Sequence, residues 1–291
     1  MKLSVKLCLA VIALYAFAAL YGGVRYLAAR WTDTTASYNV VHSEARYLPP
    51  LSVATVRTDA GGTASSFFLL GTDNLGRSVG ERLVQGTMIA FVVGIVTSAL
   101  AIALGVLLGL LGGYFRGWVD SAVVWACATV ASMPGLLFIL AISLVFGKGL
   151  WGLIAGIGLT TWVGVCRTVR AEVMKHADRA YVQAAKTLGY SSARIMFRHI
   201  LPNVAHIILI QFSIRFPSAV STEVFVSFLG IGVQGEPSWG IMIDNARQRL
   251  WQGIWWEMTF TTLAIFVLVL VFNHLADYLR DRLDPALRSE R

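Results

Sequence analysis

The sequence has few charges for its length. Asp, Glu, Lys and Arg make up 14% of its 291 residues, whereas 56% are hydrophobic. A small soluble domain carries roughly 25–35% charged residues on its surface. The composition therefore argues against an ordinary soluble enzyme, and its hydrophobic content excludes an intrinsically disordered chain. The mean hydropathy of +0.67 predicts that most of the chain is surrounded by lipid.

Motifs of nucleotide and metal chemistry are also missing. The chain has no GxxxxGK[ST] phosphate-binding loop and no HExxH pair, and its five histidines are scattered. Two stretches fit GxGxxG, at 147–152 and 230–235, but neither lies in the strand–turn–helix context of a dinucleotide fold. We expect no catalytic residue, no cofactor and no metal site in this chain.

Cysteine is rare, and basic residues are in excess. Cys8, Cys127 and Cys166 lie in apolar stretches and form no CxxC pair, which is typical of small apolar residues in helices rather than of disulfides. The formal net charge is +8. The tryptophans sit mostly in or beside apolar stretches instead of on a basic face, so we expect no nucleic-acid partner.

Six stretches approach the length of about 20 apolar residues that a membrane helix needs. The third contains Pro134, and the fifth carries Arg215, Pro217 and Glu223. We predict an all-α membrane protein with six transmembrane helices and both termini on one side. The first stretch, with its basic start and the Ala16–Ala18 triplet, also fits a signal peptide, whose cleavage would leave five spans. The stretches are residues 7–24, 88–111, 122–146, 149–166, 204–229 and 258–276.

Basic residues predict the orientation. The loop after the fourth stretch carries seven Lys and Arg between residues 167 and 198, opposed only by Glu172 and Asp178. Cytoplasmic loops are enriched in Lys and Arg. We predict that this loop and both termini are cytoplasmic, and that residues 25–85 and 231–256 lie outside. For residues 31–75 we predict no firm secondary structure.

The basic loop has the pattern of a helix–glycine–helix hairpin. Asp178 is a candidate N-cap, Gly189 a candidate C-terminal stop, and Ser191 or Ser192 a second cap. Its apolar residues recur at helical spacing and predict one apolar face. This pattern leaves two interpretations open: an amphipathic helix on anionic lipid, or a docking element for a cytoplasmic partner. The predicted face consists of Tyr181, Ala184, Ala185 and Leu188.

Small residues recur at helical spacing in two of the predicted spans. In the second they include Gly105, Gly109 and Gly113, and in the fourth Gly156 and Gly164. Such patterns let helix backbones approach closely, so we predict tight packing of these helices.

Several segments, in one register over residues 70–288, resemble a known family. Gln183-Ala184-Ala185, Gly189 and Leu201-Pro202 resemble the EAA–G–LP loop of ABC-importer permeases. Other segments are similar to the dipeptide/oligopeptide/nickel permeases of the second-permease type. The chain departs from the pattern at Gln183, where Glu is usual, and at Ser78, where Asp is usual. The similar segments are residues 70–77 (LGTDNLGR), 112–120 (GGYFRGWVD), 223–234, 237–240 (PSWG) and 272–288.

The resemblance implies a type I ABC importer permease with a cytoplasmic coupling hairpin, in a bacterial inner membrane. It implies three kinds of protein partner besides membrane lipid: a homologous permease, two ATPases that hold ATP and Mg, and an extracytoplasmic solute-binding protein. The solute would be a peptide or a related compound, and the motifs do not separate these. The residues implied in docking to an ATPase are Gln183, Ala184, Ala185, Leu188 and Gly189.

The chain divides on this basis into four parts. Residues 1–30 form the first span, 31–77 an extracytoplasmic loop, 78–280 the permease domain with its coupling loop at 167–202, and 281–291 a cytoplasmic tail. Two other classes remain open: an ion-coupled secondary transporter, for which Glu223 is the one clear intramembrane carboxylate, and a membrane assembly protein.

Arg215 and Glu223 are candidates for the translocation path. They lie eight residues apart, on roughly one helix face and about 12 Å from each other along the axis. Ionisable residues within a span usually face the bundle interior or a water-filled cavity. The alternative is that one or both reach the membrane surface.

Overall fold

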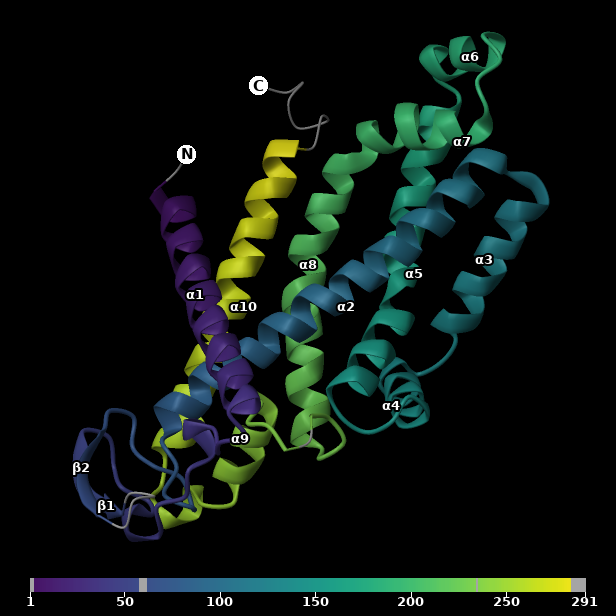
Figure 1. Ribbon diagram of the computed structural model, residues 1–291. Coiled ribbons are helices and arrows are strands. Elements are labelled where there is room, and N and C mark those ends of the chain that lie inside the picture. Colours follow the sequence, from purple (N-terminus) through teal and green to yellow (C-terminus); the bar gives the residue numbers. More distant parts are fainter. Residues whose placement is uncertain (1–2, 58–61, 234, 284–291) are drawn as a thin grey trace. The chain divides into compact units, whose positions relative to one another are not determined.

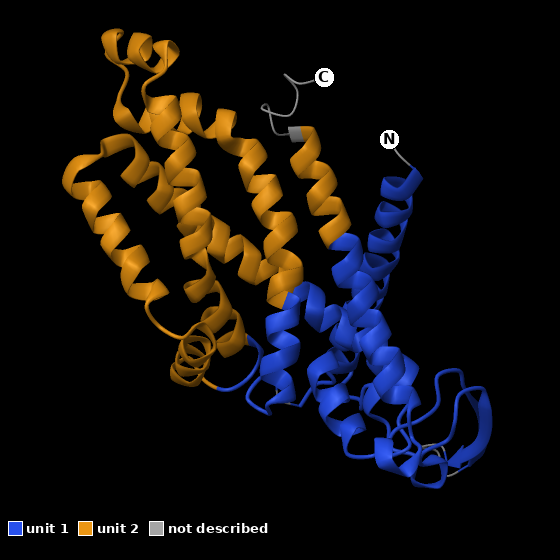
Figure 2. Ribbon diagram, turned by 180° about the vertical axis from the view of Figure 1, so that it is seen from behind, with its two compact units in different colours: residues 1–93, 148–150, 220–272 blue, residues 94–147, 151–219, 273–291 orange. Residues whose placement is uncertain are grey.

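The computed structural model describes residues 3–57, 62–233 and 235–283. It is mainly helical (Figure 1) and divides into two compact units (Figure 2). Unit 1 comprises residues 1–93, 148–150 and 220–272, and unit 2 comprises residues 94–147, 151–219 and 273–291. Gln234 and most of the predicted tail, residues 284–291, lie outside the described residues, as do the ends of the chain.

Five described helices are long and apolar enough to cross a membrane, which confirms five of the six predicted spans. Each extends beyond its predicted apolar stretch, because polar residues at the ends continue the same helix. They are α1 (Leu3–Trp31), α2 (Val79–Phe115), α5 (Leu150–Ala177), α8 (Leu201–Phe228) and α10 (Trp256–Leu283).

The third predicted span is not one straight helix. It consists of α3 (Gly117–Ala131) and α4 (Gly135–Val145), which are bent by 94° at the break between them. Proline has no N–H to donate, and its ring keeps the preceding residue out of the helical region. Pro134 therefore ends α3 and stands as the N-cap of α4. The break falls within the third predicted stretch, and if the bent pair is counted as one span the described helices give the six spans that were predicted.

Unit 1 contains a small extramembrane fold that the sequence did not predict. Strands β1 (Ser52–Arg57) and β2 (Thr63–Phe68) form an antiparallel hairpin, with Ser52 opposite Phe68. Two short 3-10 helices, η1 (Ser37–Asn39) and η2 (Ser43–Ala45), precede it. Every second residue of β1 is at least partly buried, and Val56 and Phe68 pack with Ala45 in a small core.

A turn after the hairpin connects this small fold to the start of α10. The carboxylate of Asp73 accepts the backbone N–H groups of Leu75 and Arg77, each at 2.9 Å, and Arg77 Nε at 2.7 Å. The indole Nε1 of Trp256 donates to the Thr72 carbonyl at 3.0 Å. The LGTDNLGR segment is therefore an internally bonded turn that also fixes the first residue of α10.

Two further hydrogen bonds join distant segments of unit 1. Helices α1 and α10 lie side by side (Figures 1 and 2), and the Tyr15 hydroxyl donates to the Ala264 carbonyl at 3.0 Å. Helix α9 (Trp239–Arg247) follows α8 and is capped by Ser238, and η4 (Leu250–Gln252) follows α9. Trp239 is fully buried and donates through Nε1 to the Leu83 carbonyl at 3.2 Å.

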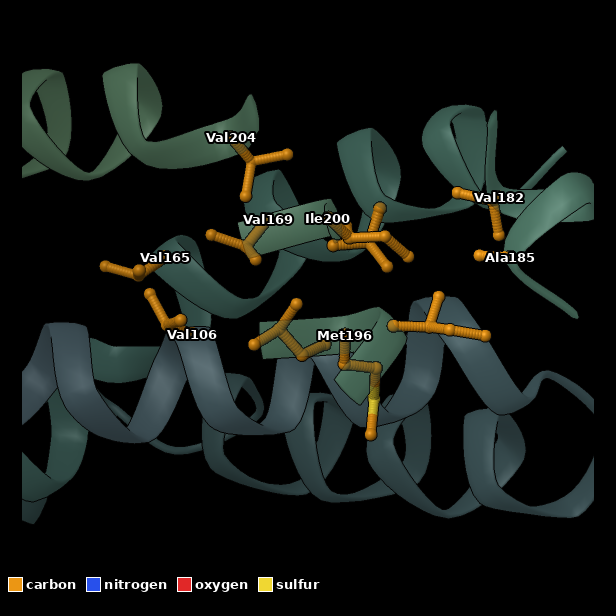
Figure 3. Packing of buried hydrophobic residues seen from close by; sticks show 11 residues of the cluster. Val106, Val165, Val169, Val182, Ala185, Met196, Ile200 and Val204 are labelled. Carbon is orange, nitrogen blue, oxygen red and sulfur yellow. The ribbon is translucent and has the colours of Figure 1, made fainter. Parts of the chain in front are cut away.

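The core of unit 2 lies where α2, α5 and the start of α8 meet. Val106, Val165, Val169 and Val204 belong to this cluster (Figure 3). A Cβ atom added at Gly113 would lie 2.8 Å from the Arg170 carbonyl oxygen, so only glycine permits this approach. The predicted tight packing is confirmed for the second span, because α2 approaches α5 closely where α2 has glycine and therefore no side chain.

Candidate functional site

The basic loop folds as the predicted helix–glycine–helix hairpin. Helix α6 (Ala180–Thr187) is followed by Gly189, whose φ of +79° lies in the left-handed region. The side chain of Ser191 then accepts the N–H of Arg194 at 3.4 Å and caps α7 (Ser192–Arg194). A short π-helix, η3 (Ile195–Ile200), continues into α8. We call residues 180–194 the coupling hairpin.

Helix α6 begins one residue later than the sequence suggested. Arg179 is its N-cap, and Asp178 is not. The Asp178 carboxylate instead accepts a hydrogen bond of 2.5 Å from Arg116, in the turn between α2 and α3. Arg116 also donates to the Met174 carbonyl at 3.3 Å. Asp178 thus forms an ion pair with Arg116, which is distant in the sequence. Its carboxylate is directed to this arginine and does not cap α6.

The buried face of α6 differs from the predicted apolar face. Val182 and Ala185 are buried in the unit 2 core (Figure 3). Leu188 is 72% exposed, and Tyr181 and Ala184 are exposed as well. Of the four predicted residues, only Ala185 faces inward, because the neighbouring apolar side chains of α5 and η3 lie on the Val182 side. An apolar face of α6 is therefore left uncovered within this chain.

Gln183 is engaged within the hairpin itself. Its Nε2 donates to the Ala177 carbonyl at 3.1 Å, at the last residue of α5. The final carbonyls of a helix have no intrahelical partner, and a side-chain donor satisfies one of them. A glutamate at this position has no such donor when ionised. Gln183 thus makes a hydrogen bond to the end of α5 that an ionised glutamate, the usual residue in the family pattern, could not make.

The GGYFRGWVD segment contacts both α5 and the coupling hairpin. Asp120 forms a bidentate pair with Arg170 of α5: Nη2 lies 2.6 Å from Oδ2, and Nε donates to Oδ1. The Lys186 ammonium of α6 lies 5.3 Å from the centroid of the Tyr114 ring, a cation–π contact. Sequence reasoning recognised this segment only by its resemblance. The pairing with Arg170 joins residues 50 positions apart and has no local signal.

Arg215 lies in unit 2, in the middle of α8. It is half-buried, and its Nε is buried without a hydrogen-bond partner in the part of the chain that the structure describes. Its guanidinium lies directly over Gly164 of α5, in the space that a Cβ atom would fill. One helical turn earlier, Gln211 Nε2 lies 3.4 Å from the Thr168 hydroxyl.

Glu223 has different surroundings in unit 1. It is 0% exposed, and its Oε1 accepts a hydrogen bond of 2.7 Å from Ser227. The Ser227 hydroxyl in turn accepts the backbone N–H of Val233 at 3.3 Å. Glu223 therefore helps to hold the turn after α8. The structure does not pair it with Arg215, and a path-lining role for either residue stays a prediction.

Comparison with known proteins now adds a family. The family described as "Binding-protein-dependent transport system inner membrane component" matches residues 101–289. The dipeptide transport system permease protein DppC of Bacillus subtilis (strain 168) is 34% identical over 219 residues, covering 75% of this chain and 68% of that protein. The glutathione transport system permease protein GsiD of Pectobacterium atrosepticum is 35% identical over 226 residues, covering 77% and 75%.

A third relative and two solved structures agree with these matches. The oligopeptide transport system permease protein OppC of Bacillus subtilis (strain 168) is 34% identical over 220 residues, covering 75% of this chain and 72% of that protein. An inward-facing structure of the MetNI methionine ABC transporter has a TM-score of 0.56 at 16% identity, covering 68% and 95%. An amino acid ABC transporter has a TM-score of 0.53 at 17% identity, covering 70% and 94%. These structures confirm the predicted fold class.

Proposed function

The chain belongs to the family of binding-protein-dependent transport system inner membrane components, and from this premise we propose that it forms part of a peptide importer. It is the permease subunit of an ABC transporter rather than an enzyme, and ATP hydrolysis takes place on separate subunits. The names of the relatives given above describe transport of dipeptides, glutathione and oligopeptides. Small peptides are the solute class common to them.

The proposed importer has the usual partners of this family. A homologous permease completes the translocation path, and a solute-binding protein delivers the peptide from outside. Two cytoplasmic ATPases bind ATP with Mg²⁺ and hydrolyse the ATP. This hydrolysis powers transport. In this chain, the residues of the coupling hairpin receive the resulting motion.

One observation carries the proposed coupling role: α6 is anchored on one side and uncovered on the other. Val182 and Ala185 are buried in the core that α5 and α8 share, whereas Leu188 is 72% exposed. An uncovered apolar helix face fits a groove on a protein partner. Because the opposite side is packed rigidly, a displacement of α6 is passed on to α5 and α8. Gln183, Ala184 and Gly189 complete this docking element.

The proposed orientation places the coupling hairpin and both termini in the cytoplasm. It is supported by the seven basic residues of the loop at 167–198. Single cysteines at Ser4 and Ser289, in a chain whose three native cysteines are replaced, test it with a membrane-impermeant thiol reagent. Ser289 lies outside the described residues. Labelling of both sites only from the cytoplasmic side is expected, and labelling from opposite sides would contradict the topology.

Two experiments test the proposed function as a whole. A tagged chain should copurify with an ATPase and a second permease, and its absence from any such complex would favour a membrane assembly protein. Proteoliposomes that hold the complete complex should take up dipeptides only with ATP and the binding protein. Uptake by the isolated chain, driven by an ion gradient, would instead indicate a secondary transporter.

A further inference from the structure

Two helices of unit 2 present polar residues to each other in the middle of membrane spans. On α8, Gln211, Arg215 and Ser218 follow one another at i, i+4 and i+7, so they share one helix face. On α5, Thr161, Gly164 and Thr168 share a face in the same way. We call these six residues the polar seam.

Two contacts show that the faces meet. Gln211 Nε2 lies 3.4 Å from the Thr168 hydroxyl, and the Arg215 guanidinium covers Gly164. Any side chain at position 164 would displace the guanidinium. The glycine therefore provides the space in which the cation lies against the α5 backbone.

Arg215 lies near the middle of α8. It is the fifteenth of the 28 residues of this helix. At a rise of 1.5 Å per residue, about 20 Å of helix extends on either side of it. Its guanidinium lies over Gly164, which belongs to the fourth predicted apolar stretch, so the charge is placed beside an apolar segment of α5.

The charge of Arg215 has no counter-ion in the described part of the chain. No carboxylate there forms an ion pair with it, and its buried Nε has no hydrogen-bond partner. Asp120 is paired with Arg170, and Glu223 accepts its hydrogen bond from Ser227. An unpaired arginine inside a membrane span costs about 2.5–3.5 kcal/mol on insertion scales, and such residues mark solute pathways.

We propose that Arg215 and the polar seam bind the side-chain carboxylate of an acidic peptide during its passage, and so favour it over a neutral peptide of the same shape. This inference rests on the proposed function and adds the charge of the solute to it. The planar guanidinium matches a carboxylate in bidentate geometry. Gln211 and Thr168 supply neutral hydrogen-bonding groups one turn away. Arg215 is partly exposed although its Nε is buried, so part of the residue is accessible to a carboxylate.

The test measures uptake by the complete importer in proteoliposomes. Three dipeptides differ only in charge at the second side chain: Ala-Glu, Ala-Gln and Ala-Lys. The binding protein is kept saturated and is the same in every assay, so any change in preference between variants arises in this chain. The wild-type importer should take up Ala-Glu faster than Ala-Gln, and Ala-Lys most slowly.

Three variants separate charge from structure. Arg215→Met should lower the ratio of Ala-Glu to Ala-Gln uptake about tenfold, the size of one lost charge-assisted hydrogen bond. Arg215→Lys keeps the cation and should retain most of the preference. Ile214→Met changes the neighbouring residue, which is exposed outside the seam, and should leave rate and ratio unchanged. Copurification of the partner subunits and basal ATPase activity report on assembly in each variant.

Each other outcome overturns the inference. An unchanged ratio in Arg215→Met would remove Arg215 from solute recognition. An equal fall for all three dipeptides would show a general structural effect. Loss of the second permease in Arg215→Met, restored in Arg215→Lys, would show that Arg215 pairs with a carboxylate of that subunit. If the wild-type complex imports none of the three peptides, the proposed function itself fails, and this inference falls with it.

Discussion

In two turns of the chain an aspartate forms an ion pair with an arginine. The two turns differ in how far apart in the sequence the paired residues lie. The Asp73 turn, residues 70–82, is local: Arg77 lies four positions away, and the Asp73 side chain is 1% exposed. Arg82 lies 3.7 Å from the same carboxylate and is also buried. The Asp120 turn, residues 112–120, joins a partner 50 positions away, and its two side chains are 26% and 19% exposed.

The difference separates a stability element from a positioning element. The Asp73 turn satisfies its own backbone N–H groups and neutralises buried guanidinium groups, so its removal should disrupt unit 1. The Asp120 turn is partly solvated, and solvation weakens such a pair. Its main effect is to fix the C-terminal part of α5 beside the turn that also contacts the coupling hairpin. We therefore expect loss of the first to abolish folding and loss of the second to impair coupling.

Asp73→Ala should have the largest effect. Removal of one partner from a buried ion pair costs about 3–5 kcal/mol, because the buried guanidinium of Arg82 loses its ion-pair partner Asp73. The midpoint of thermal unfolding in detergent and the amount of protein in the membrane should both fall. Asp244→Ala, which removes a partly exposed surface pair with Arg247, is the matched control and should change neither. Wild-type stability of Asp73→Ala would show that the turn is not a stability element.

Gly189→Val should uncouple transport while the protein remains in the membrane. At φ of +79° a β-branched residue is strained by about 1–2 kcal/mol, and relief of this strain would redirect α6. No atom lies within 4 Å of the added Cβ, so the effect comes from the backbone alone. ATP-driven uptake should fall severalfold. Gly189→Asn, which tolerates the left-handed region, should retain most activity, and full uptake by Gly189→Val would contradict the docking role.

Asp120→Ala should have a smaller effect on stability than on coupling. A partly exposed bidentate pair contributes about 1 kcal/mol, which a double-mutant cycle with Arg170→Ala measures directly. Uptake per ATP hydrolysed should fall, while the level of the protein in the membrane stays near wild type. The exchanged pair Asp120→Arg with Arg170→Asp should recover part of the coupling. Folding loss as large as that of Asp73→Ala would remove the distinction between the two turns.

Gln183→Glu should have the smallest effect of the four. The carboxylate cannot donate to the Ala177 carbonyl, and one lost hydrogen bond costs about 0.5–1.5 kcal/mol. Hydrogen exchange of the α6 amides should become faster, with little change in overall stability. Gln248→Glu makes the same chemical change at an exposed position and should not alter exchange in α6. Unchanged exchange in Gln183→Glu would show that this hydrogen bond does not stabilise the hairpin.

Local patterns predicted much of this molecule. Apolar length located five spanning helices, and Gly189 marked the end of α6 because its conformation is determined by its own backbone. The small residues of α2 predicted close packing, which Gly113 shows. Each of these features has a signal that lies within one continuous segment of the chain.

The features that were missed depend on contacts between distant segments. Hydropathy measures apolar length and not direction, so the bend at Pro134 was read as one span. The β-hairpin has a short alternating pattern whose inward residues find their core only in Ala45 and its neighbours. On α6, the choice of Val182 rather than Leu188 as the buried residue is made by α5 and η3, which the local pattern does not contain.

The break between α3 and α4 sets a requirement on what surrounds it. The first turn of a helix has N–H groups without intrahelical partners, and no side chain caps α4 at Pro134. In hydrocarbon each such group costs several kcal/mol, so this turn of backbone is stable only against protein or water. The amide hydrogens of the first turn of α4 should therefore exchange with deuterium from the solvent far faster than those in the middle of α5. This bend therefore lies where protein or water, and not acyl chains, surrounds the backbone.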